Sequence, residues 1–440
     1  MSAVPAGLAT DKQPPMTVPL RYFLVGFAFL LAGGGVGLAG AFDVAPGFAR
    51  LAHVHLLLAG WVCLTIMGAM TQFVPVWSNT ALHSRRLANA ALALVAVGVG
   101  GLAAAFLATS IHWIHGFGGI LVAGIWVFAY NLARTLATLD RLDATEAHFA
   151  FALACFVVLA ALGFLLAFDF STQILPFAGI SRPEVVGAHA TLAVFGAILG
   201  TVFGALYQLA TMFTQTEIHG RERHLVHVEY GYPVGVVALA TGRLLGAATL
   251  ATAGGLLMAV GALAFAVLLA RKLHEGRVER TPMLSRYAVV AVALAAWAPL
   301  AANAWLSDPL ARTSLFGPPT AVHLLFVGVV GFVVMGSLYH VVPFIVWVHR
   351  YSDRLGFEQV PMIDDLYSDR LAAADGALVA FGTVTLLLAR AGVLPDGVVV
   401  AGGVLLAAGL VVFTANLVGV VYRHGRVLPE RFRTHTENAD

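Results

Sequence analysis

The sequence predicts an all-α polytopic membrane protein with twelve transmembrane helices, arranged as three pseudo-threefold-related repeats of four helices. Three observations predict this fold. The 440 residues are 60% hydrophobic and only 11% charged, whereas a soluble protein carries about 25% charged residues. Apolar stretches of about 20 residues, long enough to cross a bilayer, follow one another along the chain. A sequence pattern recurs at nearly regular intervals, which indicates an internal repeat.

The spans are read in order from these apolar stretches. The seventh is the weakest, because it contains Arg243 and is interrupted by Gly and Pro. The expected spans are 21–43, 51–77, 87–108, 112–136, 147–169, 185–213, 228–246, 248–271, 286–305, 319–348, 371–391 and 397–422.

We therefore expect a single membrane domain over 21–422, between polar cytoplasmic tails at 1–20 and 423–440. Its repeats cover about 21–140, 147–272 and 286–422. The fourth span of a repeat carries its own weak signal, because Phe128-x-x-Asn131-Leu132 recurs as Phe413-x-x-Asn416-Leu417.

Basic residues predict the orientation, because loops rich in Lys and Arg stay on the cytoplasmic side. With the N-terminus inside, the inner tails and loops hold all but five of the 25 Lys and Arg residues. Arg50, Arg182, Arg312 and Arg390 fall in outer loops, and Arg243 falls within a span. The chain is thus predicted to be a multi-pass protein of the plasma membrane with both termini in the cytoplasm.

The repeated pattern lies on the second span of each repeat and starts at His55 and again at His323. Each His is followed at the same spacings by a Gly, a polar residue and a Pro. The two series are Gly68, Gln72 and Pro75, and Gly336, His340 and Pro343. A fainter middle copy has Thr191 at the main position, with His189 two residues earlier, where it aligns with His53.

Six histidines are predicted to gather near the outer face, because they all lie at the starts of even-numbered spans. An intramembrane His is costly and indicates a functional site. His55 and His323 share a repeat position, which suits two axial ligands of one haem iron. His53, His189, His112 and His115 are candidates for a second site that binds copper or another haem. His112 and His115 are also compatible with an interfacial belt around Trp113.

The remaining polar and sulfur-containing residues have simpler interpretations. His340 lies about 25 Å along the helix from His323, and so near the inner face. The two cysteines, Cys63 and Cys155, are expected to be core residues without a disulfide. The other histidines are expected to be solvated in inner loops or tails: His83, His148, His219, His224, His227, His274, His349, His424 and His435.

Twelve helices in three groups of four, with histidines on the second, sixth and tenth, resemble subunit I of the haem–copper oxidase superfamily. The segment from His323 to Pro343 is similar to the tenth helix of that family. The resemblance implies that His323 is an axial ligand of a low-spin b-type haem, with His55 as its partner. The start of the second span, His53-x-His55 with Gly60, also resembles the NnrS family, whose members are associated with haem and copper.

The chain departs from the oxidases at the oxygen-reducing centre. The tenth helix of the oxidases carries a second His two residues earlier, where this chain has Ala321. The seventh helix normally supplies adjacent histidines to copper, but the span at 228–246 has none. The resemblance therefore supports the low-spin haem site and does not identify catalytic residues.

The sequence thus predicts a haem-binding membrane protein for redox chemistry or electron transfer. If the chain is an enzyme, the resemblance implies an oxidoreductase of the oxidase or nitric oxide reductase type. The expected partners are the lipid bilayer, a redox donor and other respiratory subunits, for which the loop 349–370 with Asp364 and Asp365 is a candidate docking surface. The competing hypotheses are an NnrS-like haem–copper protein and a copper-handling protein without haem.

Overall fold

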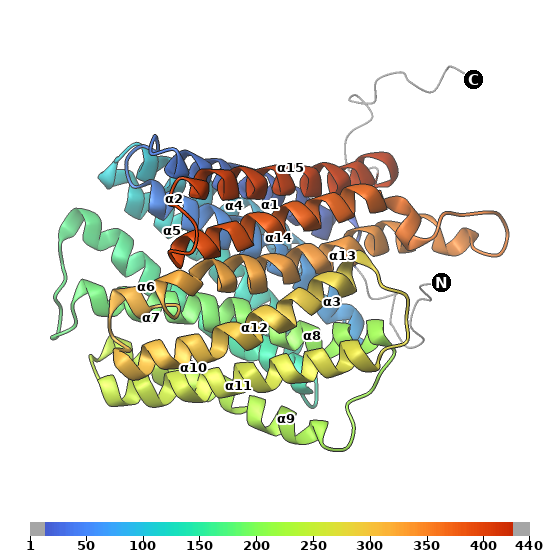
Figure 1. The fold of residues 1–440 in the computed structure, drawn as a ribbon. Helices are drawn as coiled ribbons and strands as arrows, with labels where there is room; N and C mark the ends of the chain where they lie inside the picture. The colour runs from blue at the N-terminus through green and yellow to red at the C-terminus, as the bar shows by residue number, and fades with distance from the viewer. Residues whose placement is uncertain (1–13, 426–440) are drawn as a thin grey trace.

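The computed structural model describes residues 14–425, and within that range it contains helices and no strand. The helices run roughly parallel to one another in a single bundle (Figure 1). The long helices are α1 (Thr17–Ala41), α3 (Leu64–Trp77), α4 (Arg85–Leu107), α5 (Ile111–Leu136), α6 (Ala144–Thr172), α8 (Gly200–Thr214), α10 (Gly231–Leu244), α11 (Ala248–Glu275), α12 (Pro282–Ser307), α13 (Phe332–Arg350), α14 (Asp369–Arg390) and α15 (Val398–His424). The shorter ones include α2 (Ala49–His55), α7 (Arg182–Thr191) and α9 (Glu222–Glu229).

Within the described residues, eleven helices are long and apolar enough to cross a membrane. The predicted seventh span is a helix, α10, but it has only 14 residues. At 1.5 Å per residue it extends about 21 Å, less than the roughly 30 Å of a hydrocarbon core. The twelfth span is therefore not confirmed. The predicted tails lie mostly outside the described residues.

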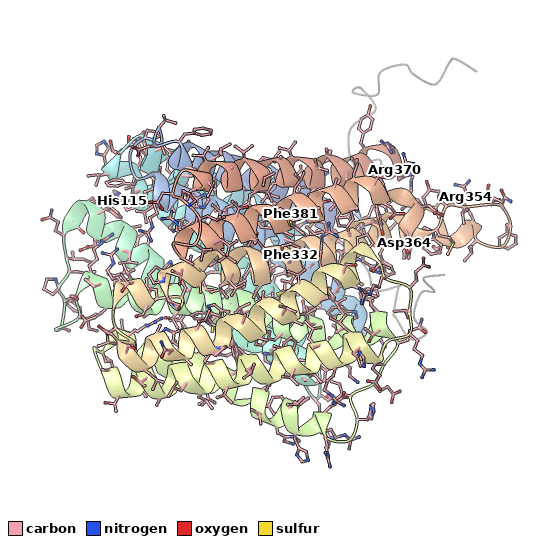
Figure 2. The ribbon with its side chains drawn as sticks, in the orientation of Figure 1. His115, Phe332, Arg354, Asp364, Arg370 and Phe381 are labelled. Carbon is pink, nitrogen blue, oxygen red and sulfur yellow. The ribbon has the colours of Figure 1, made fainter. Side chains whose placement is uncertain are left out.

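The outer surface of the bundle is apolar, as contact with lipid requires. The side chain of Phe381 on α14 is 67% exposed, whereas that of Phe332, at the start of α13, is 3% exposed (Figure 2). A soluble protein does not leave many large apolar side chains exposed along its length. The membrane class predicted from composition is thus supported by where the apolar side chains lie.

For description we group the helices in chain order into three sets, α1–α5, α6–α11 and α12–α15. The most extensive contacts join α4 to α5, α10 to α11, and α14 to α15. The sets meet through α5 with α6, α11 with α12, and α15 with α1. The chain therefore closes into a ring in which the last helix packs against the first.

The second span of each set lies inside the ring and changes its helical pitch. The spans Arg182–Thr214 and Leu324–Arg350 bury 83% and 78% of their most apolar windows, against 22% for α15. Three π-helices of eight residues occur in the described residues: Leu56–Cys63, Leu192–Leu199 and Leu324–Gly331. They begin directly after His55, Thr191 and His323, so the same rare conformation follows the same position of the sequence pattern three times. Such segments are frequent at functional sites.

The weak pattern on the fourth spans corresponds to a pair of identical clamps. Asn131 Oδ1 accepts the backbone N–H of Ser84 (2.9 Å), and its Nδ2 donates to the Ser84 carbonyl (2.9 Å). Asn416 bonds to Ser368 in the same way, at 3.0 and 2.9 Å. Each Asn thus fixes the residue that caps the next-to-last helix of its set. In the middle set α10 begins without a side-chain cap.

The two ends of the bundle differ in chemistry. We call one end the histidine end, because α2 and α7 begin there and His115 lies there; the other, where Arg354, Asp364 and Arg370 lie, is the basic end (Figure 2). The predicted gathering of histidines at one level agrees with this arrangement.

Candidate cofactor-binding histidines

His53 and His189 are held in the same way by the first helix of their own set. The Nδ1–H of His53 donates to the carbonyl of Gly33 on α1 (2.8 Å), and that of His189 donates to the carbonyl of Leu159 on α6 (2.9 Å). A carbonyl only accepts, so the hydrogen must lie on Nδ1 in both rings. The Nε2 atom of a neutral ring then keeps its lone pair. This arrangement, with one nitrogen bonded to a carbonyl and the other left for a metal, is typical of metal-ligating histidines.

Each of these two rings also lies against a glycine one turn beyond the carbonyl. A Cβ built on Gly37 would lie 2.5 Å from Cε1 of His53, and one built on Gly163 would lie 2.9 Å from Cε1 of His189. Such contacts are closer than real side chains make. Glycine is therefore required at both positions for the imidazoles to occupy their present places.

His55 is oriented by its own helix. Its Nδ1–H donates to the carbonyl of Leu51 (2.8 Å), so its Nε2 also keeps a lone pair. The ring packs against Phe106 at the end of α4, with 5.4 Å between ring centroids. Because successive residues turn by about 100°, His53 and His55 leave opposite faces of α2.

The structure gives each histidine a neighbour from another set of helices. His189 lies close enough to His55 for the two rings to interact electrostatically. His323 interacts in the same manner with His53 and with Arg390, at the end of α14. The sequence predicts a pairing of His55 with His323 because they share a repeat position, and this pairing stays a prediction. Each of the pairs His53–His323 and His55–His189 combines a histidine at the main repeat position, His323 or His55, with one at the position two residues earlier, His53 or His189.

A third pair of the same repeat positions would contain no histidine. It would join Thr191, at the main position of the middle copy, to Ala321, two residues before His323. The hydroxyl of Thr191 instead accepts a hydrogen bond from Nη1 of Arg243 (2.7 Å). The guanidinium of Arg243 also donates to the carbonyls of Pro309, Leu315 and Ser314. This buried cation is satisfied by dipoles, and it lies beside Thr191.

His112 and His115 remain apart from these pairs in their contacts. His112 is exposed, and Nδ1 of His115 lies 3.2 Å from the hydroxyl of Ser171 on α6. Among the described residues, one group of three potential metal ligands lies within mutual reach, at His219, Glu222 and Glu275. The ammonium of Lys272 already sits between both carboxylates, at 2.7 Å from Glu222 and 2.5 Å from Glu275. That group therefore has its cation from the protein itself.

One histidine expected in solvent is buried. His148 is 3% exposed, because it lies one turn into α6 on the face covered by α8 and α9. Its Nε2 lies 3.2 Å from Glu229, which also accepts the hydroxyl of Tyr207 (2.8 Å). Sequence reasoning missed this group. The available signal was Tyr207 and Tyr339, which stand at the same repeat position, one residue before Gln208 and His340.

Other predictions agree with the structure or differ in small ways. Both cysteines are free, with Cys155 buried and Cys63 partly buried. His340 lies between Phe213 and Phe344, with ring centroids 4.1 and 5.6 Å away. His435 lies outside the described residues.

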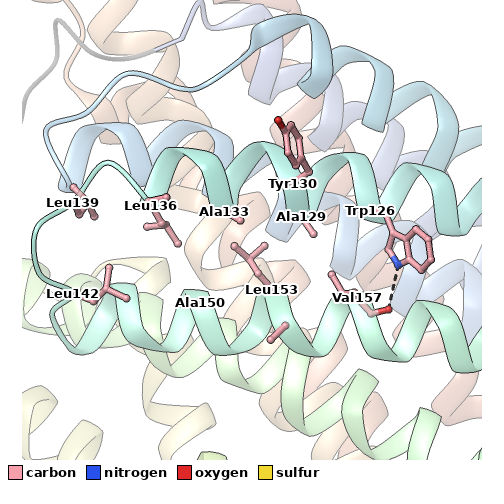
Figure 3. Close-up of a pocket in the computed structure, with 12 residues that line it drawn as sticks. Trp126, Ala129, Tyr130, Ala133, Leu136, Leu139, Leu142, Ala150, Leu153 and Val157 are labelled. Carbon is pink, nitrogen blue, oxygen red and sulfur yellow. Dashed lines mark hydrogen bonds between the residues drawn. The ribbon is translucent and has the colours of Figure 1, made fainter.

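A groove on the outside of the bundle does not belong to the histidine pairs. It has a volume of about 570 Å³ and lies between α5, from Trp126 onward, and α6, up to Val157 (Figure 3). Its lining is alanine, leucine, valine and the two partly exposed rings of Trp126 and Tyr130. Such a groove suits contact with lipid chains and offers no metal ligand.

No protein-family model matches the chain, and no curated protein matches it.

Proposed function

We propose that this chain is a haem-binding integral membrane protein, similar to subunit I of the haem–copper oxidases, that serves electron transfer. The observation that carries the proposal is the pair of equivalent histidine couples at the histidine end. Each couple joins helices of neighbouring sets, and three of the four rings have the Nδ1–carbonyl bond that leaves Nε2 for a metal. Bis-histidine ligation of this kind is a common way to hold a low-spin haem iron.

In this proposal His53 and His323 hold a b-type haem, and His55 and His189 hold a second haem or a copper ion. A bound haem supplies reversible one-electron oxidation and reduction. Arg390, which lies near His323, offers positive charge to an anionic group of the cofactor. The pairing replaces the combination of His55 with His323 that the sequence suggested.

The layout is best explained as three repeats of four helices around a pseudo-threefold axis. Three π-helices at one repeat position, two identical Asn–Ser clamps and the closed ring of contacts all support it. Such an axis would create three equivalent interfaces, of which two carry histidines and the third carries Arg243.

Electron transfer is favoured over gas reduction by the residues present. Because His53 and His55 leave opposite faces of α2, the two proposed centres would be separated by about one helix, roughly 10 Å across. Reduction of oxygen or nitric oxide needs a further ligand set, and the interface that would supply it has Thr191, Ala321 and a fully bonded Arg243.

The competing function is copper handling without haem. It is favoured by the closeness of His55 and His189, because two imidazoles from two helices suffice to bind copper. In that case the His53–His323 couple would bind no haem.

Optical spectra of the purified protein test the proposal, in the oxidised and dithionite-reduced states with and without carbon monoxide. We expect sharp reduced bands insensitive to carbon monoxide. His53→Ala and His323→Ala should abolish the same component, whereas His55→Ala and His189→Ala should leave it and remove a second haem component or bound copper. His340→Phe serves as the matched control, because His340 is a partly buried His on the same span as His323.

Two outcomes contradict the proposal. Protein that binds copper but no haem would establish the copper-handling alternative. Loss of one component in His55→Ala and His323→Ala together, with His53→Ala unaffected, would restore the pairing suggested by the sequence. Gly163→Ala gives a further check, because the added methyl group displaces the His189 ring and should weaken only the second site.

A further inference from the structure

The basic end of the bundle contains three equivalent positions on the first helices of the three sets. Tyr22, His148 and Arg286 pack against Gly68, Gly204 and Gly336, the glycines of the repeated pattern. A Cβ built on each glycine would lie 2.7, 2.7 and 3.0 Å from the Cβ of the facing residue. The three side chains therefore occupy the same place in three different chemical forms.

In the third set this place holds a permanent ion pair. The guanidinium of Arg286 bonds to the carboxylate of Asp375, which also accepts the hydroxyl of Tyr339. Asp375 is fully buried and the side chain of Arg286 is 5% exposed. Arginine stays charged at every physiological pH, so this pair is fixed. In the first set the neutral phenol of Tyr22 donates to the carbonyl of Ala88 (2.6 Å).

In the second set the same arrangement is built with a base that can lose its proton. Glu229 is fully buried, accepts the hydroxyl of Tyr207 at the position equivalent to Tyr339, and lies 3.2 Å from Nε2 of His148. Two atoms of this group have no hydrogen-bond partner, although they are buried: Nδ1 of His148 and Oε1 of Glu229. A satisfied structural network would not leave both open.

Apart from His148, the groups around Glu229 carry no positive charge that would neutralise its carboxylate. Tyr207 on α8 and Tyr232 on α10 interact with it, and Tyr230 and Cys155 lie next to these tyrosines. Phenols and thiols are neutral near pH 7. Helix α11 contributes Phe265, which packs on Tyr207. Within the described residues, His148 is the one ionic partner of Glu229.

We propose that His148 and Glu229 form a buried binding site for a single proton near the basic end of the middle set. A buried carboxylate without a compensating charge is strongly unfavourable, so the pair holds one proton, shared between imidazole and carboxyl. The Arg286–Asp375 pair offers no such proton, because its guanidinium is always charged.

The site is independent of the proposed haem. Along α6, His148 lies 15 residues from Gly163, the residue beneath His189, which corresponds to about 22 Å. The proton site can therefore be tested in protein with or without cofactor.

The test is an infrared titration of the purified full-length protein in nanodiscs, from about pH 4 to pH 9, around the usual pKa of histidine. We expect one protonation step with carboxyl and imidazole bands. His148→Arg copies the third set and should fold while abolishing the step. Glu229→Gln should also abolish it, and this isosteric change keeps the test valid if His148→Arg fails to fold. Tyr22→Phe, at the equivalent position of the first set, should retain the step in full.

Two results would overturn the proposal. One is a wild-type carboxylate whose bands stay constant over the whole range. The other is a protonation step of unchanged size in folded His148→Arg or Glu229→Gln.

Discussion

At the scale of single residues, buried charge is placed only where another group compensates it. Arg243 is surrounded by carbonyl oxygens, Asp375 faces Arg286, and Glu222 faces Lys272. Each arrangement satisfies a group that would otherwise be very costly in an apolar interior. Glu229 differs from these residues, because its partner His148 is charged only when it is protonated.

Glu222 allows a prediction about pH. Its burial alone would raise the pKa, but hydrogen bonds from Lys272 and Arg271 outweigh burial and hold the pKa of Glu222 below its usual value. A carboxyl whose folded pKa is lowered stabilises the protein fully above its unfolded pKa and loses this effect as pH falls through the folded pKa. We expect Glu222→Gln to lower the Tm in detergent at neutral pH and to approach wild type in acid. A difference in Tm that stays constant down to acid pH would contradict this account.

At the scale of helices, the Asn–Ser clamps explain how a spacing that recurs within the chain becomes a fixed helix start. Asn131 and Asn416 satisfy both backbone groups of the residue that begins the neighbouring helix, in sets one and three. In the middle set Leu268 stands at this position, and α10 is the short helix. The two helices that begin at a clamp, α4 and α14, have 23 and 22 residues, whereas α10, which begins without one, has 14.

Asn131→Ala and Asn416→Ala should each destabilise the protein by about 1–3 kcal/mol, because the partly buried backbone N–H of Ser84 or Ser368 loses its acceptor. The two losses should add in the double variant, since the clamps share no residue. Thermal unfolding of the purified protein measures both effects. Ser84→Ala is the control: it removes the side-chain cap of α4 but keeps the backbone groups that Asn131 binds, and should cost about 1 kcal/mol. If Asn131→Ala costs no more than this control, the clamp is not what fixes the helix.

At the scale of the whole molecule, charge distribution and chemistry divide the bundle into two ends. Positive residues gather at one end and candidate ligand histidines at the other. The positive-inside rule predicts that the basic end faces the cytoplasm, which would place the proposed redox centres near the outer face and the proposed proton site near the inner face.

Cysteine labelling checks this orientation. In a background with Cys63 and Cys155 replaced by Ala, we expect Phe177→Cys to react with a membrane-impermeant maleimide on intact cells. Phe357→Cys should react only after the membrane is opened. Both positions are well exposed, at 72% and 91%. The reverse pattern would invert the topology and with it the sides assigned to both sites.

Much of the fold was predictable because it depends on properties read along one helix at a time. Hydropathy and length located the spans, and the repeat from His55 to His323 located three equivalent helices that all contain a π-helix. Span seven failed the length criterion because the chain turns at Tyr230, between α9 and α10. A local turn of this kind leaves little trace in an averaged apolar stretch.

The sequence by itself determined the membrane class, the approximate spans and the gathering of His53, His55, His189 and His323 at one end, because these follow from hydropathy and from rise per residue. Only the tertiary structure decided which histidines are neighbours. Repeat position makes His55 and His323 equivalent, whereas the electrostatic interactions of the folded chain join His53 to His323 and His55 to His189. The same reason hid the His148–Glu229 pair, whose members are 81 residues apart and meet through packing alone.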